Sequence, residues 1–193
     1  MFVRMMIAGC LALGACGGKT EGAPDGTGEA PAPTLDPAAV TAAQAKVPAG
    51  VAVTFEAVQG DKARLMAVQP KGWETGVIPG RVKPPMGSNL GFMTSFSTGT
   101  NCDGECAPKD WGAVVEKVEF ASFGGKFDKD DKLPDGRLVV VKSGDRVDIV
   151  LARWKEGAEH YFVCRATLDR ELLAATDAFE EACRQMQPLT WDH

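Results

Sequence analysis

Residues 137–167 read RLVVVKSGDRVDIVLARWKEGAEHYFVCRAT, and this stretch decides the fold. It contains three runs that are rich in β-branched and aromatic residues, Arg137–Lys142, Arg146–Trp154 and Tyr161–Thr167. The segments KSGDR and KEGAE between them are rich in turn-forming residues, and connections this short join antiparallel neighbours. The stretch therefore predicts a three-stranded antiparallel meander.

Amphipathic helices are predicted on both sides of the meander in the sequence. The helix before the meander can be capped by Asp110. The apolar residues that follow it recur with the spacing of one helix face: Trp111, Val114, Val115 and Val118. After the meander, a longer apolar stripe starts from Asp169 and ends before Pro188: Leu172, Ala175, Phe179, Ala182, Cys183 and Met186.

The N-terminal half of the folded region predicts a hairpin and one further strand. Val51–Val58 and Lys62–Gln69 are the two hairpin strands, joined by turn-forming residues, and Leu90–Thr98 is the further strand. Thr75–Asn89 is too rich in Pro and Gly for regular structure, and a loop of this length is often functional, so we expect it to be the recognition surface. We expect Phe127–Gly136 to be a charged, solvated loop.

The order of these elements resembles a known fold group. A hairpin closed by Pro70-Lys71-Gly72-Trp73-Glu74, a long loop, a strand, a helix, a meander and a terminal helix resemble the PsbP/Mog1 type of α/β sandwich. The resemblance covers roughly Val51 to Gln187. It implies an α+β fold in which helices cover an antiparallel sheet, and a binding or accessory role. It implies no functional residue.

The first residues, MFVRMMIAGCLALGAC, have the features of an export signal. One positive charge precedes an apolar run that is too short to span a membrane, and small residues follow. Leu13-Gly14-Ala15-Cys16 resembles the lipobox of bacterial lipoproteins, which implies removal of residues 1–15 and attachment of lipid to Cys16. Ile7-Ala8-Gly9-Cys10 also fits the pattern, but cleavage there would leave a very short apolar run. The alternative is an ordinary soluble secretory signal.

The lipoprotein resemblance implies a location in the cell envelope. Gly17 follows the lipidated cysteine where Asp would favour the inner membrane, so the resemblance favours the outer membrane, with the protein facing the periplasm or the exterior. Several acyl chains hold a protein firmly, whereas one chain binds only marginally.

The sequence predicts a tether and one folded domain after the signal. Residues 16–48 contain the lipidated cysteine and a segment rich in Gly, Ala and Pro, which cannot form a core. Near its end Asp36 and Pro37 favour the start of a short helix, which we expect to reach Lys46 and to pack loosely. Residues 49–193 are expected to form a single disulfide-stapled domain.

Four of the six cysteines remain once Cys10 is removed with the signal and Cys16 carries lipid. An even number in an exported domain predicts two disulfides, with three possible pairings. Proximity favours Cys102 with Cys106 and Cys164 with Cys183. Cys183 lies on the apolar face of the last predicted helix, and Cys164 lies in the strand before it.

The pair Cys102 and Cys106 also allows a different function. Its C-x3-C spacing resembles that of Sco-type copper proteins, which implies an envelope protein for thiol redox chemistry or copper handling. The βαβ order of a thioredoxin fold is missing, and the acids Asp103 and Glu105 should raise the pKa of both thiols and reduce their reactivity. We therefore prefer a structural disulfide and predict no metal or cofactor.

No catalytic set of residues emerges from the sequence. Asp128, Asp130 and Asp131 fail the calcium-loop pattern, because Lys132 and Leu133 occupy positions 5 and 6. His160 is expected in an exposed turn. Four tryptophans, at 73, 111, 154 and 191, could line a ligand groove, but core packing is the preferred interpretation for Trp111 and Trp154.

The charge of the chain argues against nucleic acid as a partner. The chain has 21 basic and 26 acidic residues, a net charge of −5, and no basic cluster. Nucleic-acid binding needs clustered Lys and Arg, so we predict none. The sequence favours a non-catalytic binding or accessory protein, held to a membrane by its N-terminal lipid, with another envelope protein as its partner.

Overall fold

The computed structural model describes residues 33–62, 64–102 and 110–191. Cys10, Cys16 and Cys106 lie outside these residues, so the lipid anchor and the Cys102–Cys106 pair stay predictions. The helical segments are α1 (Pro37–Gln44), α2 (Trp111–Val115), the π-turn η1 (Glu116–Phe120), the 3-10 turns η2 (Ala121–Phe123) and η3 (Arg170–Ala175), and α3 (Thr176–Arg184). The strands are β1 (Phe55–Gly60), β2 (Leu65–Pro70), β3 (Glu74–Thr75), β4 (Arg81–Lys83), β5 (Ser95–Asn101), β6 (Lys129–Leu133), β7 (Gly136–Ser143), β8 (Arg146–Arg153), β9 (Tyr161–Asp169) and β10 (Gln187–Pro188).

Seven strands form one antiparallel sheet in the order β3-β4-β5-β9-β8-β7-β6. The predicted meander β7-β8-β9 is confirmed, and Ile149 of β8 lies opposite Val140 on one side and Ala166 on the other. Strand β5 pairs with the free side of β9, so the meander becomes the centre of a wider sheet. Its inner strands carry apolar residues on both faces, because both faces are covered.

The predicted hairpin β1-β2 is confirmed as part of a second, three-stranded sheet in the order β1-β2-β10. Its turn lies later than expected: Gly60 is still in β1, and the turn residues Asp61 and Lys62 adopt positive φ angles of 45° and 53°. The chain returns to this sheet after α3, where Pro188 pairs with Leu65.

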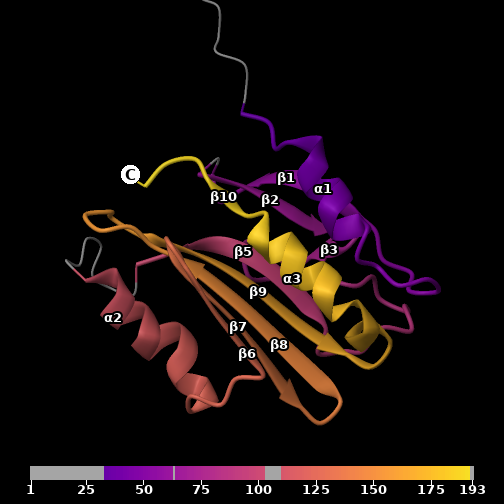
Figure 1. The fold of residues 1–193 in the computed structure, drawn as a ribbon. Coiled ribbons are helices and arrows are strands. Elements are labelled where there is room, and N and C mark those ends of the chain that lie inside the picture. Colours follow the sequence, from indigo (N-terminus) through magenta and orange to yellow (C-terminus); the bar gives the residue numbers. More distant parts are fainter. Residues whose placement is uncertain (1–32, 63, 103–109, 192–193) are drawn as a thin grey trace, which may run out of the picture. The chain divides into compact units, whose positions relative to one another are not determined.

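Helix α3 packs between the two sheets (Figure 1). It contacts β8 and β9 of the large sheet, β2 of the small sheet, and α1. Phe179 of α3 is fully buried, and its ring lies 5.3 Å from that of Phe55 in β1, 6.2 Å from that of Phe96 in β5 and 5.7 Å from that of Trp73. The main core is therefore the layer between the two sheets.

Helix α2 and the π-turn η1 cover the opposite face of the large sheet. Trp111, Val115 and Phe120 pack there against alternate residues of the central strands, including Val139 and Val150. Neighbouring strand residues such as Leu138 and Ile149 point to the main core instead. The fold class predicted from the sequence, an antiparallel sheet covered by helices, is confirmed.

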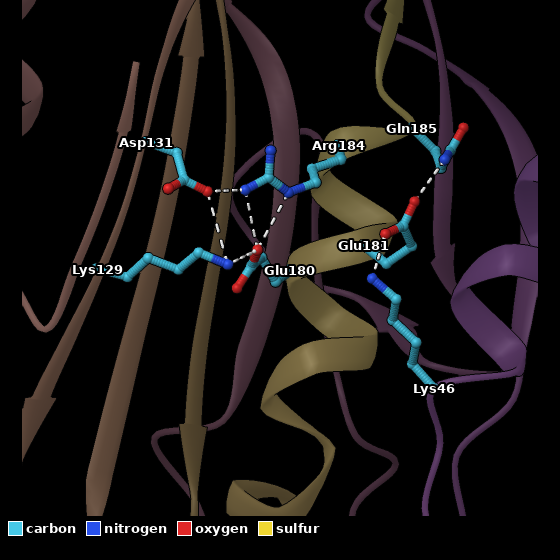
Figure 2. A network of polar contacts seen from close by, with 7 residues as sticks. All are labelled: Lys46, Lys129, Asp131, Glu180, Glu181, Arg184 and Gln185. Carbon is cyan, nitrogen blue, oxygen red and sulfur yellow. Dashed lines mark hydrogen bonds and ion pairs between the residues drawn. The ribbon is translucent and has the colours of Figure 1, made fainter. Parts of the chain in front are cut away.

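Two kinds of bond hold α3 in place beyond apolar packing. A disulfide joins Cys183 of α3 to Cys164 of β9, both fully buried, which is the pairing that the sequence favours. A polar network then ties α3 to β6 on one side and to the segment after α1 on the other (Figure 2).

The polar network has two parts. On the β6 side, Glu180 accepts hydrogen bonds from Lys129 at 2.6 Å and from Arg184 at 3.0 Å, and Arg184 also pairs with Asp131. The hydrogen bond to Glu180 raises the pKa of Lys129.

On the α1 side, Lys46 donates to Glu181 at 2.5 Å and Gln185 donates to the same carboxylate at 2.6 Å. Burial works against ionisation of Glu181, but these two hydrogen bonds outweigh it, and the pKa of Glu181 lies below its ordinary value.

Three expectations from the sequence need correction. The compact unit begins at Pro33 and not near residue 49, because the small residues Ala39 and Ala43 let α1 pack closely on α3 within the core. The charged segment 127–136 contains strand β6, whose polar side chains suit the outer edge of a sheet. The segment 75–89 includes the short strand β4, and the next strand starts at Ser95 and not at Leu90.

Candidate binding surface

The segment between β3 and β5 exposes large apolar side chains. Among the described residues, the large apolar side chains that are mainly exposed all lie in this segment: Val77, Ile78, Met86, Phe92 and Met93. We name these five residues the 77–93 surface. Phe92 is 87% exposed and Met86 94% exposed. Exposed apolar side chains that gather in one segment are typical of an interaction site.

The first part of the segment is a tight hairpin tip whose shape is fixed by backbone contacts. The Gly76 N–H donates to the Arg81 carbonyl at 2.8 Å, and the Thr98 N–H donates to the Gly80 carbonyl at 3.1 Å. Gly80 has a φ of +73°, and a Cβ there would lie 2.3 Å from the Thr98 oxygen. Only glycine fits this approach to β5, and the resulting turn directs Val77 into solvent.

The second part of the segment is held by a single carboxylate. Asp169, at the end of β9, accepts a hydrogen bond from the Thr94 hydroxyl, and its oxygens lie 2.0 Å from where a Cβ at Gly91 would be. Leu90 packs against the main core, whereas Phe92 points outward. Residues 83–94 thereby enclose a hollow of about 360 Å³ with a largely apolar lining.

The electrostatics of the segment differ from those of the whole chain. Between residues 75 and 95 there are two basic residues, Arg81 and Lys83, and no acidic one, although the chain carries a net charge of −5. Lys83 Nζ lies 5.3 Å from the centre of the Phe92 ring, and Arg81 donates to the Ser95 hydroxyl at 2.9 Å. An acidic partner with an apolar segment would complement both features.

The acidic residues that raised the calcium hypothesis do not converge. Asp128 accepts from the Lys142 N–H at 2.5 Å, Asp130 pairs with Arg137, and Asp131 pairs with Arg184. Within residues 33–62, 64–102 and 110–191, no group of three His, Cys, Asp or Glu side chains is placed to hold a metal ion.

His160 differs from its sequence prediction. It was expected in an exposed turn, but it is 1% exposed and its ring lies 4.9 Å from that of Phe162. The turn residues Lys155–Gly157 are exposed instead, because the chain re-enters the fold before β9 begins.

A buried carboxylate was missed by sequence reasoning. Glu119 in η1 is 1% exposed and accepts hydrogen bonds from the Tyr161 hydroxyl at 2.9 Å and from the Asn101 amide at 3.4 Å. It also forms an ion pair with Arg165, whose pKa is lowered by burial. These bonds tie the π-turn to β5 and β9, which is a structural role. The charged sequence EKVEF gave no signal that one of its acids is buried.

Comparison with known proteins adds one finding. No family model matches the chain, and no curated protein matches it either. Among solved structures, the chain is similar to the Ran-binding protein Mog1p of Saccharomyces cerevisiae, with 11% sequence identity and a TM-score of 0.47. The match covers 72% of this chain and 97% of Mog1p. In the described part of the chain, no helix is both long and apolar enough to cross a lipid bilayer.

Proposed function

We propose that this protein is a lipid-anchored protein of the cell envelope whose domain binds another envelope protein through the 77–93 surface. The observation that carries the binding role is the placement of Val77, Met86 and Phe92 in solvent on a backbone fixed by Gly80 and Asp169. A preformed apolar surface loses little conformational freedom on binding, which favours affinity.

The anchoring part of the proposal rests on the sequence LGAC at residues 13–16. Its experiment compares the full chain with Cys16→Ser in a bacterial host fed a radiolabelled fatty acid. We expect label and membrane association in the wild-type chain and neither in the variant. A Cys10→Ser control should keep both, because Cys10 is removed with the signal. Equal labelling of the Cys16→Ser chain would contradict the anchor.

The binding part is tested by site-specific photocrosslinking in cells. A benzoylphenylalanine at position 92 should form one dominant crosslinked product with an envelope protein, and the same group at the exposed Lys142 should not. A second substitution, Lys83→Glu, should reduce that product because it reverses the local charge while the crosslinker stays at position 92. Identical crosslinking from positions 92 and 142 would remove the support for a specific partner.

The competing hypothesis of thiol redox or copper chemistry has its own measurement. It requires Cys102 and Cys106 to react with a thiol reagent or to bind copper in the protein purified from an oxidising compartment. We expect no reactive thiol and no copper in that sample. Two reactive thiols would make the redox interpretation the leading one.

A further inference from the structure

Three of the four tryptophans meet at one hollow that is separate from the 77–93 surface. The hollow has a volume of about 740 Å³ and includes Trp111 at the start of α2, Trp154 just after β8 and Trp191 after β10. The start of α2 and the turn between β8 and β9 lie at the same end of the large sheet (Figure 1). We name this place the tryptophan hollow.

The walls of the tryptophan hollow are fixed by the turn between β8 and β9. The buried Trp111 donates from Nε1 to the Ala158 carbonyl at 2.8 Å, and the Glu159 N–H donates to the Trp191 carbonyl at 3.2 Å. The Trp191 ring also packs edge-on against Phe162, with 5.0 Å between ring centres. The turn is thereby tied to two other segments, so the hollow exists before any ligand arrives.

Trp154 completes the aromatic wall. The backbone N–H of Trp154 donates to the Asp135 carbonyl at 2.9 Å. Its indole Nε1 lies 3.5 Å from the position that a Cβ at Gly112 would occupy. The indole is thus beside the first turn of α2 and only partly buried. Trp154 and Trp191 both keep part of their apolar surface in contact with solvent at the hollow.

The charged side chains that line the hollow are three acids and one base: Asp110, Asp135, Glu156 and Lys155. Asp135 accepts from Arg153 at 2.6 Å, and the exposed Glu156 is next to the exposed Lys155. Asp110 uses one oxygen to cap α2 through the Ala113 N–H at 3.1 Å. A carboxylate has about four acceptor sites and an ammonium group has three donors, so the hollow offers both acceptors and donors to a ligand.

This combination disfavours an anion and suits a ligand that is apolar on its faces and polar at its edge. The face of an indole carries negative charge density, which attracts the weakly positive C–H bonds on the flat side of a sugar ring. The hydroxyl groups around such a ring donate to carboxylates and accept from an ammonium group. A second hollow of about 300 Å³ shares Lys155, Glu156 and Trp191, so the site extends beyond one ring.

We propose that the tryptophan hollow binds a neutral oligosaccharide, which stacks on Trp154 and Trp191 and hydrogen-bonds to Glu156 and Lys155. This inference does not depend on the 77–93 surface or on the lipid anchor.

The experiment measures binding of a panel of neutral trisaccharides of glucose, N-acetylglucosamine, galactose and mannose. The full chain is purified in a detergent without sugar head groups. Ligand binding is followed by tryptophan fluorescence and by saturation-transfer NMR, which detects the sugar C–H protons in contact with the protein. We expect saturable binding of at least one trisaccharide, with saturation transfer to the protons of one ring face.

Variants separate a binding role from a structural one. Trp154→Ala should weaken binding about tenfold or more through lost stacking, while Trp154→Phe should retain part of the affinity. Glu156→Gln, at an exposed position, should weaken binding without changing the melting temperature. Phe92→Ser is the matched control and should bind as the wild type does.

Three results would overturn the proposal. They are no saturable binding of any trisaccharide, full affinity in both Trp154→Ala and Glu156→Gln, or binding of tetramethylammonium in place of every sugar. The last result would mean that the carboxylates and indoles form a site for an organic cation.

Discussion

Replacing Phe179 by alanine should cost about 4–5 kcal/mol of the free energy of unfolding. The side chain is fully buried and contacts rings from both sheets, those of Phe55 and Phe96, together with Trp73. Phe→Ala in a protein core costs about 3–5 kcal/mol through lost burial and the remaining cavity. Each aromatic pair adds roughly 0.5–1.5 kcal/mol, which places this site in the upper part of the range.

The expected cost is large because Phe179 lies where no single neighbour can fill the gap. A collapse toward β1 would open a space against β5, and a collapse toward β5 would do the reverse. The disulfide between Cys164 and Cys183 further limits movement of α3. Incomplete relaxation of this kind is what makes a cavity costly.

The assay is urea unfolding followed by circular dichroism, with Phe92→Ala as the matched control. Both variants lose the same atoms, but Phe92 is 87% exposed and its substitution should change the free energy of unfolding by less than about 0.5 kcal/mol. If Phe179→Ala cost less than about 2 kcal/mol, or if the two substitutions cost the same, the packing of α3 between the sheets would be wrong.

Three further predictions concern the disulfide, the pH dependence and the hairpin tip. Cys164→Ala with Cys183→Ala should lower the free energy of unfolding by about 3 kcal/mol, from the entropy of a loop closed at a sequence separation of 19, and calorimetry of the two chains measures the difference. Because the pKa of Glu181 is lowered in the folded state, its contribution to stability is present above its ordinary value of 4.5 and is lost as the pH falls through the folded value. Replacing Lys46 by Met should therefore cost roughly 0.3–1 kcal/mol at neutral pH and make acid unfolding less steep, and an unchanged pH profile would contradict the ion pair. Gly80→Ala should cost about 1–3 kcal/mol in thermal unfolding, since its backbone is left-handed and a Cβ meets a carbonyl of β5, and no loss would show that the tip rearranges freely.

The sequence predicted those elements whose pattern is local and repeated. The meander was predictable because each run of β-branched residues is bounded by Gly-containing turns. The structure adds the register, in which Ile149 lies opposite Val140 and Ala166. Helix α3 was predictable from the apolar stripe that contains Phe179 and Cys183. The first turn of the predicted helix is the 3-10 segment η3 and not α-helix.

The missed elements depend on contacts with distant segments. Strand β6 has no apolar pattern, and it exists because β7 offers an unpaired edge to Lys129–Leu133. Strands β3 and β10 have two residues each and form only where a partner strand is already in place. Helix α1 was predicted from Asp36 and Pro37, but it has little apolar surface of its own, so its place in the core depends on contact with α3.

The sequence predicted the first part of the candidate binding surface but not the second. The Pro and Gly content of residues 75–89 indicated a long loop with a role in recognition. The sequence also predicted that Phe92 and Met93 belong to a strand, Leu90–Thr98, whereas the strand begins at Ser95. Their exposure is set by Gly91, which must lie against Asp169 of β9, a residue that is distant in the sequence.

The outer strand β6 has a consequence for molecules that meet at high local concentration. A sheet that ends in a bare strand can be extended by the sheet of a second copy, and this is a common start of aggregation. Here the last strand reads KDDKL, with one lysine on each side of two adjacent aspartates. A second β6 placed beside it in parallel register would bring Lys next to Lys and Asp next to Asp and remove these charges from water. The charges of β6 therefore oppose extension of the seven-stranded sheet by a second copy at this edge.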